Sequence, residues 1–332
     1  MNLFYVTSPF QYICANEARN SYQSLNTILV VEFDDTEKGL LQLKSIIDPS
    51  LWDHVFYLPA GNRTKTTPKL IKKIKGLCKE LDLVEEGFFF AEFNSLRTKV
   101  IISNFTFQRH IYFDDGALTL FEYEETIKPN KEYYRPRLIP DLIMKAKGIK
   151  PAGRMHNPNN LEIFTIFNIN SDKYPIVRNT LQLLNEDYKF NPHNENSPVG
   201  FLGQGSVGDK NHKPIDDYLS EIIYFLRENK EILYFPHRNE KEEVSNKIKR
   251  LNGVKYYEAS KPIELEIIRQ SIRLSKIVGM GSTALFTCRV LFPDLPVVNI
   301  VNTNKNDLVV RNKYEIIESQ LNKAGVSMIH LC

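Results

Sequence analysis

Three short stretches combine residues that could carry chemistry, and each of them follows an apolar run. The first is Asp114-Asp115-Gly116, directly after His110–Phe113. Paired carboxylates on a turn can hold a metal ion, or one can act as a general base while the other keeps a structural role. Asp-Asp-Gly is also a common turn sequence, so the triplet alone leaves both interpretations open.

The second stretch is His237-Arg238, which comes after the apolar run Ile232–Phe235 and the strand-ending Pro236. Ligands of open α/β sheets bind beyond the carboxyl ends of the strands. A histidine there can donate a hydrogen bond to a phosphate and stabilise the charge on a departing nucleotide, and an arginine can add a charge-assisted contact. A purely structural histidine is the alternative interpretation.

The third stretch is Gly281-Ser282-Thr283, between the apolar run Ser275–Val278 and a helix predicted to start near Ala284. The glycine lets the backbone approach a ligand closely, and the hydroxyl and free N–H groups of a helix start can bind phosphate oxygens. A plain helix cap is the alternative. The P-loop is excluded because its lysine is missing.

Two further residues stand at predicted helix starts. Glu264 follows Pro262 and can either interact with the helix dipole or bind the two hydroxyls of a ribose. Ser8 precedes Pro9 and is placed to cap a helix, although the turn that it occupies can also face a ligand.

Two series of apolar runs and amphipathic patterns position these residues. In the first half we predict strands at 3–6, 27–33, 54–58, 87–91, 99–102 and 110–113, with helices at 11–21 and 36–47. In the second half we predict strands at 199–202, 232–235, 254–257, 275–278 and 296–301, with helices at 215–228, 240–250, 262–272 and from 284. Residues 120–158 look irregular and would form either an acceptor cleft or a packed connector.

The two series predict an α/β protein of the GT-B type, with two Rossmann-like domains facing a central cleft. The largely apolar strands are typical of parallel sheets covered on both faces. Residues 187–198 are polar and rich in turn-forming residues. We therefore expect an N-terminal domain at 1–190 and a C-terminal domain at 191–332.

The composition is that of an ordinary globular protein. A chain of 332 residues suits two domains, and its net charge of +3 is weak for nucleic-acid binding, so we expect no nucleic-acid partner. The cysteines are scattered and predict a reduced cytosolic set rather than disulfides or a zinc site: Cys14, Cys78, Cys288 and Cys332. No signal peptide and no apolar run of about 18 residues is found, so we expect a cytoplasmic protein.

Residues 63–79 predict an amphipathic helix with a basic outer face. The segment contains no acidic residue and seven cations: Arg63, Lys65, Lys69, Lys72, Lys73, Lys75 and Lys79. Such a face is either simply solvated or able to lie on an anionic membrane surface. The second interpretation would place the protein peripherally on the cytoplasmic face of an inner membrane.

In their order and strand-end placement, these motifs together resemble the bacterial GT-B sialyltransferases, which comprise lipooligosaccharide sialyltransferases and capsular polysialyltransferases. The opening Ser8-Pro9-Phe10-Gln11 and the later Phe201-Leu202-Gly203-Gln204 are also similar to that group. The resemblance spans residues 3–300. It implies an inverting, metal-independent enzyme that needs no cofactor and moves sialic acid, or a related nonulosonic acid, from a CMP-activated donor to a hydroxyl of a bacterial surface glycan.

The resemblance also implies residue roles. Asp115 would be the general base, and His237 would bind the donor phosphate and assist the departure of CMP. Ser282 and Thr283 would hold the same phosphate, and Glu264 the ribose. The donor-binding set implied as a whole is Ser8, Gly203, Gln204, His237, Arg238, Glu264, Gly281, Ser282 and Thr283.

The chain departs from the family at one position, because Arg238 stands where the family has proline after the histidine. Two alternatives therefore stay open. One is a GT-B transferase that uses another nucleotide sugar, such as CMP-Kdo or a UDP-sugar. The other is a non-catalytic protein that binds a precursor during capsule assembly.

Overall fold

The computed structural model describes residues 1–33, 43–187, 190–210, 212–301 and 308–331. The chain divides into two compact units. The first consists of Met1–Thr165 and Ile169–Asn179, and the second of Ile166–Asn168 and Thr180–Cys332. The sequence had suggested a boundary at residue 190.

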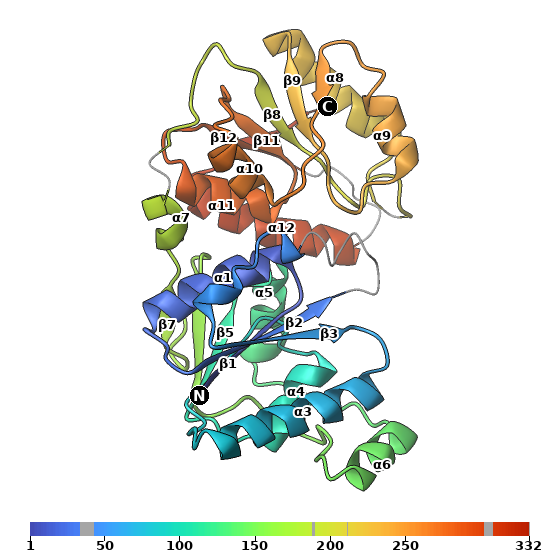
Figure 1. The fold of residues 1–332 in the computed structure, drawn as a ribbon. Coiled ribbons are helices and arrows are strands. Elements are labelled where there is room, and N and C mark those ends of the chain that lie inside the picture. The colour runs from blue at the N-terminus through green and yellow to red at the C-terminus, as the bar shows by residue number, and fades with distance from the viewer. Residues whose placement is uncertain (34–42, 188–189, 211, 302–307, 332) are drawn as a thin grey trace. The chain divides into compact units, whose positions relative to one another are not determined.

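The first unit is built on a parallel sheet with strand order β3-β2-β1-β4-β5-β6-β7 (Figure 1). Its strands are β1 (Asn2–Val6), β2 (Thr27–Phe33), β3 (His54–Pro59), β4 (Gly87–Phe90), β5 (Arg109–Phe113), β6 (Leu161–Thr165) and β7 (Ile176–Arg178). The order 3-2-1-4-5-6 is that of a Rossmann fold, here with one more strand at the edge.

Helices cover both faces of this sheet. They are α1 (Pro9–Ser21), α3 (Arg63–Glu80), α4 (Leu96–Asn104), α5 (Leu118–Glu122) and α6 (Leu138–Ala146), with short 3-10 and π segments at Pro49–Leu51 and Tyr123–Ile127. α1 lies on one face, while α3 and α4 lie on the other (Figure 1). Alternate strand residues serve the two layers, so Phe4 and Val6 pack in the core beneath α1 while Leu3 and Tyr5 are buried toward the opposite face.

The second unit repeats the same plan. Its parallel sheet has the order β10-β9-β8-β11-β12-β13. The strands are β8 (Val199–Leu202), β9 (Ile232–Phe235), β10 (Val254–Tyr256), β11 (Ile277–Gly279), β12 (Val297–Ile300) and β13 (Ser327–Ile329). The helices are α7 (Gln182–Asp187), α8 (Ile215–Asn229), α9 (Glu242–Ile248), α10 (Ile263–Arg269), α11 (Thr283–Leu291) and α12 (Leu308–Lys323).

Most predicted elements are present, and one was assigned the wrong type. Residues 99–102 are not a strand but part of helix α4, which Ser95 caps by accepting a hydrogen bond from the Thr98 N–H. The three apolar residues after Lys99 do not separate strand from helix by themselves, and the Ser95 cap decides it here. The predicted helix at 36–47 falls largely outside the described residues. Strands β6, β7 and β13 were not predicted.

The segment 120–158 is more regular than its sequence suggested, since it includes part of α5, the π segment and all of α6. The amphipathic helix expected at 63–79 is confirmed as α3, with Leu70, Ile71 and Ile74 on its buried side. Within the described parts of the chain, no helix is both long and apolar enough to cross a bilayer.

Candidate functional site

The two sheets share a feature that determines where ligands can bind. In each unit the strand order reverses beside the first strand, between β1 and β4 in one sheet and between β8 and β11 in the other. In open α/β sheets, ligands bind at such a point, beyond the carboxyl ends of the strands. Most of the candidate residues follow the strands at or beside these two points.

At the first switch point, Gln11 of α1 connects the turn after β1 with the turn after β5. Its Oε1 accepts a hydrogen bond from the Thr7 N–H at 2.7 Å, and its Nε2 donates to Asp115 Oδ1 at 2.6 Å. Ser8 caps α1 and accepts from the Gln11 N–H at 3.3 Å. The cap predicted for Ser8 is therefore present, and it supports the residue that orients Asp115.

The two adjacent aspartates have different surroundings. Asp114 is fully buried and accepts a hydrogen bond from the Thr165 hydroxyl at 2.6 Å, which joins β5 to β6. Asp115 is only partly buried, and its N–H donates to Thr119 Oγ1 at 2.7 Å. Gly116 follows with φ +61°, a conformation that favours glycine. The geometry gives Asp114 a structural position and leaves Asp115 as the carboxylate nearer to solvent.

Glu92 belongs to the same cluster and was missed in the sequence. It follows β4 across the switch point from β1, and its Oε1 accepts a hydrogen bond from the Thr7 hydroxyl at 2.8 Å. Burial raises the pKa of Glu92, and the nearby charge of Asp115 raises it further, against the Thr7 bond that lowers it. The signal was present, because Glu92 comes directly after the strand predicted at 87–91.

At the second switch point, glycines after β8 make room for the turn that follows β9. A Cβ atom on Gly203 would lie 2.7 Å from the His237 backbone nitrogen, and one on Gly205 would lie 2.5 Å from His237 Nδ1. Only residues without a side chain fit this approach. The structure thus brings His237 onto the backbone of residues 203–205.

Glu240 fixes the turn that carries His237. Its N–H donates to the His237 carbonyl at 2.9 Å, and its carboxylate accepts hydrogen bonds from the hydroxyls of Tyr234 and Tyr256, the latter at 2.8 Å. Both tyrosines stand on strands of the sheet. The turn is therefore anchored to the sheet on the side away from solvent.

The hydrogen bonding of His237 defines which ring nitrogen can act. Nδ1 accepts from the Asn239 N–H at 3.1 Å, so the neutral ring carries its proton on Nε2. Removal of the ring from water by the surrounding turn lowers the pKa of His237, and the neighbouring Arg238 lowers it further. At neutral pH the side chain is a neutral Nε2–H donor. Both His237 and Arg238 keep an exposed side.

The loops after β8 and β11 are joined directly. The Gln204 side-chain amide donates to the Met280 carbonyl, and the Gly281 N–H donates to the buried Asn299 Oδ1 at 2.8 Å. Gly281 has φ +54°. Ser282 caps α11 by accepting from the Ala284 N–H at 3.2 Å, so the cap expected as the alternative is present.

Glu264 differs from the other candidates. Its carboxyl group is buried, and it accepts a hydrogen bond from the Thr287 hydroxyl on α11, one turn beyond Thr283. Burial raises its pKa. In the turn before α10, Glu266 Oε1 accepts from the N–H groups of Ser260 and Lys261 at 2.9 and 2.8 Å. Glu264 lies in the first turn of α10, where a carboxylate interacts favourably with the helix dipole, and its contact with a ribose stays a prediction.

The candidates fall into two groups. Asp115 and Ser8 belong to the first unit, together with Gln11 and Glu92. The second unit brings together Gly203, Gln204, His237, Gly281 and Ser282, with Glu264 beneath α11. Ser8 accepts from the Gln11 N–H, and Gln11 donates to Asp115; donor binding by Ser8 stays a prediction.

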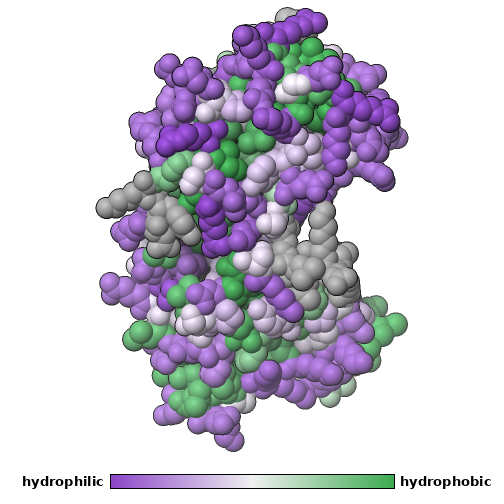
Figure 2. Space-filling model, turned by 45° about the horizontal axis from the view of Figure 1, so that its top comes forward, coloured by the Kyte–Doolittle hydropathy of each residue, from purple (hydrophilic) through white to green (hydrophobic). Residues whose placement is uncertain are grey.

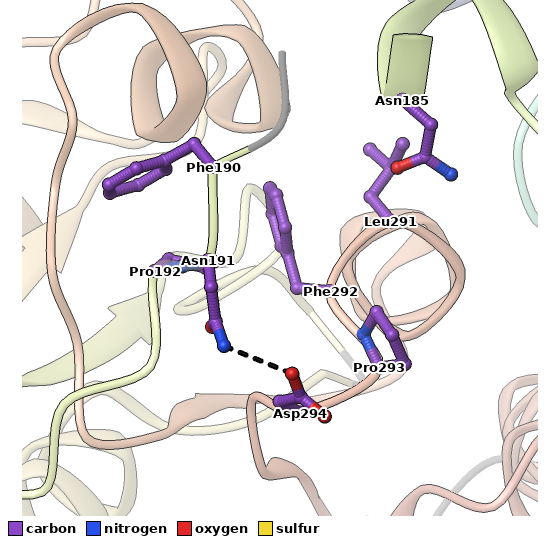
Figure 3. Close-up of a pocket in the computed structure, with 8 residues that line it drawn as sticks. All are labelled: Asn185, Phe190, Asn191, Pro192, Leu291, Phe292, Pro293 and Asp294. Atoms are coloured by element: carbon purple, nitrogen blue, oxygen red, sulfur yellow. Dashed lines mark hydrogen bonds between the residues drawn. The ribbon is translucent and has the colours of Figure 1, made fainter.

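A pocket of about 300 Å³ lies elsewhere in the second unit. It is lined by Asn185, Phe190, Asn191, Pro192, Leu291, Phe292, Pro293 and Asp294, and the Asn191 amide donates to Asp294 Oδ2 at 3.0 Å (Figure 3). Residues 190–192 lead into β8 and residues 291–294 into β12, so this pocket is at the amino edge of the sheet. It is not at the edge where a Rossmann-like unit binds its ligand.

Comparison with known proteins agrees with this architecture. No family model and no curated protein sequence matches the chain. Among solved structures, the Staphylococcus aureus MnaA–UDP complex has a TM-score of 0.51 at 10% identity, over 96% of this chain and 87% of that one. The chain has the GT-B fold, as predicted.

Other similar structures carry lower scores. The Methanocaldococcus jannaschii UDP-GlcNAc 2-epimerase has a TM-score of 0.48 at 14% identity, over 97% of this chain and 93% of that one. The Escherichia coli ADP-heptose heptosyltransferase II has a TM-score of 0.43 at 10% identity, over 98% of this chain and 100% of that one. Identities this low compare folds and not activities.

Proposed function

We propose that the protein is an inverting glycosyltransferase that moves sialic acid, or a related nonulosonic acid, from a CMP-activated donor to a hydroxyl of a bacterial surface glycan. The observation that carries the proposal is the division of chemistry between two Rossmann-like units. A partly buried carboxylate held by Gln11 stands at one switch point, and a neutral histidine N–H donor with glycine-lined turns stands at the other.

The reaction assigns a step to each group. Asp115 takes the proton from the acceptor hydroxyl as its oxygen forms a bond to the anomeric carbon. The bond between that carbon and the donor phosphate breaks, and its electron pair leaves with CMP. His237 Nε2–H, together with the backbone and hydroxyls of residues 281–283, would stabilise the charge that develops on the phosphate. Attack opposite the leaving group inverts the anomeric centre.

The choice of CMP rests on the family resemblance of the motifs, and a nucleotide panel tests it. We expect CMP to raise the melting temperature of the protein more than UDP, ADP or GDP at equal concentration, because a ligand that binds the folded state alone stabilises it in proportion to its affinity. Incubation with CMP-sialic acid and a glycan acceptor should then release CMP. Stabilisation by UDP without any response to CMP would overturn the CMP assignment.

A UDP-sugar is the second candidate. It is favoured by the likeness to the MnaA–UDP structure, and by Arg238 at the position where the sialyltransferases have proline. The same nucleotide panel separates the two candidates. A response to neither nucleotide, with no donor hydrolysis, would favour a non-catalytic role in capsule assembly.

A further inference from the structure

Helix α6 exposes a large apolar face. Leu138, Ile139 and Leu142 have exposed fractions of 87%, 73% and 68%, and Ile143 has 39%. Residues at these spacings lie on one side of a helix. Met144, which is fully buried, attaches the helix to the rest of the first unit. The four exposed side chains thus form one face, called here the α6 apolar face.

Burial within the unit does not account for this face, since the core of the first unit is filled by other residues. Large apolar side chains exposed together usually mark a site for a partner or a membrane. Figure 2 shows that hydrophobic atoms also reach the surface of the first unit in places among hydrophilic ones. Because the exposed side of α6 is apolar and its other side is attached to the unit, an apolar environment is needed to remove the exposed side from water.

The charges around α6 indicate what that environment is. Five cations occur between residues 135 and 150, against a single acid: Arg135, Arg137, Lys145, Lys147 and Lys150, with Asp141. The Asp141 carboxylate accepts a hydrogen bond from the Arg137 N–H at 3.3 Å and so serves the helix start. The exposed Tyr134, under the guanidinium of Arg154 at 3.8 Å, adds an amphipathic ring of the kind found at membrane interfaces.

Helix α3 extends this positive surface. It packs against α6 within the first unit, and its lysines and arginine are exposed along its outer side. Figure 1 shows α3 and α6 as neighbouring outer helices of that unit. An apolar helix face beside a basic helix matches the two attractions of an anionic bilayer, which are the acyl chains and the phosphate headgroups.

We propose that the α6 apolar face inserts into the interface of an anionic lipid bilayer, with the basic side of α3 against the headgroups. The inserted residues are Leu138, Ile139, Leu142 and Ile143. A purely apolar partner surface matches less well than an anionic bilayer. It would remove many positive charges from water without supplying negative ones, which is costly. The proposal does not depend on which sugar the protein transfers.

Vesicle flotation tests the insertion. Vesicles made of equal parts phosphatidylglycerol and phosphatidylcholine should carry the wild-type protein, and vesicles of phosphatidylcholine alone should carry much less. Replacing the four apolar residues of the α6 face by serine should lower partitioning by about tenfold or more. The control changes two exposed leucines of the same unit, Leu25→Ser and Leu51→Ser, and should leave partitioning unchanged.

A second pair of variants tests the charges. Lys69→Gln with Lys72→Gln should lower binding by about fivefold for each lysine, because a cation near the surface contributes about 1 kcal/mol. Lys255→Gln with Lys323→Gln, on exposed positions of the second unit, is the matched control. Raised salt should weaken wild-type binding.

Three results would overturn the proposal. One is equal partitioning of the wild type and the four-serine variant, with circular dichroism showing that both are folded. Another is equal binding to neutral and anionic vesicles. The last is sedimentation that shows a dimer lost in the four-serine variant without any vesicle binding, which would assign the α6 face to a second copy of the chain.

Discussion

The two switch points have the same topology and opposite chemistry. Beyond β1, β4 and β5 of the first sheet stand Glu92 and Asp115, which are acceptors bridged by Thr7 and Gln11. Beyond β8, β9 and β11 of the second sheet stand glycine backbone, a histidine and a capping serine. In the function proposed above, the first site would receive a proton and the second an anion.

This difference between the two sheet edges shows that the fold alone does not determine which reactive groups stand at a switch point. Both sheets deliver the ends of their central strands to one edge, because parallel strands in this order diverge there. The residues in the turn after each strand then decide what the edge can do. For this reason a single substitution at either edge should change function without changing the fold.

Asp115→Asn should have the largest effect. Asparagine keeps an Oδ1 that can accept from Gln11, so the geometry persists while the proton acceptor is lost. We expect transfer to fall by about a thousandfold, within the range for removal of a general base, with nucleotide binding unchanged. Steady-state release of CMP and calorimetric binding measure the two effects.

Asp172→Asn, at an exposed position of the same unit, is the control and should transfer normally. Near-normal turnover of Asp115→Asn would show that the first switch point does not supply the base. The comparison between the two edges would then fail.

His237→Ala should have the next largest effect, and on the other half of the reaction. Loss of the Nε2–H donor should slow transfer by about a hundredfold, as for removal of one oxyanion donor, and should weaken nucleotide binding as well. The two variants can thus be told apart, because His237→Ala weakens nucleotide binding and Asp115→Asn does not.

The pH dependence of His237 adds a check. Its pKa is lowered, so the ring takes up half of its protons at a pH below 6.5, the usual value for histidine. Protonation breaks the Asn239 N–H bond to Nδ1. We therefore expect the step in nucleotide affinity that His237→Ala removes to have its midpoint below pH 6.5. A midpoint above pH 6.5 in the free protein would contradict the arrangement of the turn.

Much of this comparison could be predicted from the sequence, because it depends on strand ends. Asp115, His237 and Gly281 were found since each follows an apolar run, and a parallel sheet places such residues at one edge. Residues whose long side chains contact a distant part of the sequence were not predicted. Gln11 bridges a separation of 104 residues to Asp115, and no local pattern encodes that contact.

The wrong or missing assignments have the same cause. Glu264 stands in the first turn of α10, as predicted, but the sequence does not show that its carboxylate accepts from Thr287 of the neighbouring α11. Residues 99–102 were too short a run to show their period, and α4 also buries Arg97 and Lys99, which no apolar pattern reveals. In both cases the outcome depends on contacts between elements that are distant in the sequence. Such contacts leave no periodic pattern in the sequence itself.

Gly205→Ala should have a smaller effect, confined to the second edge. The added Cβ would meet His237 Nδ1 at 2.5 Å, and the imidazole can move away more easily than backbone can. We expect nucleotide affinity to fall by about tenfold through the displaced donor, with little change in folding free energy. Calorimetry with the preferred nucleotide measures it.

Gly76→Ala is the matched control, because nothing lies within 4 Å of a Cβ atom at this position in α3. It should leave binding unchanged and raise the free energy of unfolding by about 0.5–1 kcal/mol, since alanine favours a helix over glycine. Unchanged affinity in Gly205→Ala would mean that His237 does not face the nucleotide.

Glu92→Gln should have the smallest effect on rate and an opposite effect on stability. Its pKa is raised in the folded protein above the unfolded value, so the folded state holds the proton more tightly, and stability falls as the pH rises through the folded pKa. Glutamine has no charge to desolvate and can still accept from Thr7. We therefore expect a higher melting temperature than wild type at pH 7, and no difference well below pH 4.5.

The rate of Glu92→Gln reports on the pairing of the carboxylates. Removing the charge that repels the one on Asp115 should move the acid limb of the transfer profile to lower pH and slow transfer at pH 7 by a few-fold, because a more easily ionised base is a weaker one. Glu80→Gln at the exposed end of α3 is the control. An acid limb that does not move would show that Glu92 and Asp115 titrate independently. The first switch point would then act through one carboxylate, as the second acts through one histidine.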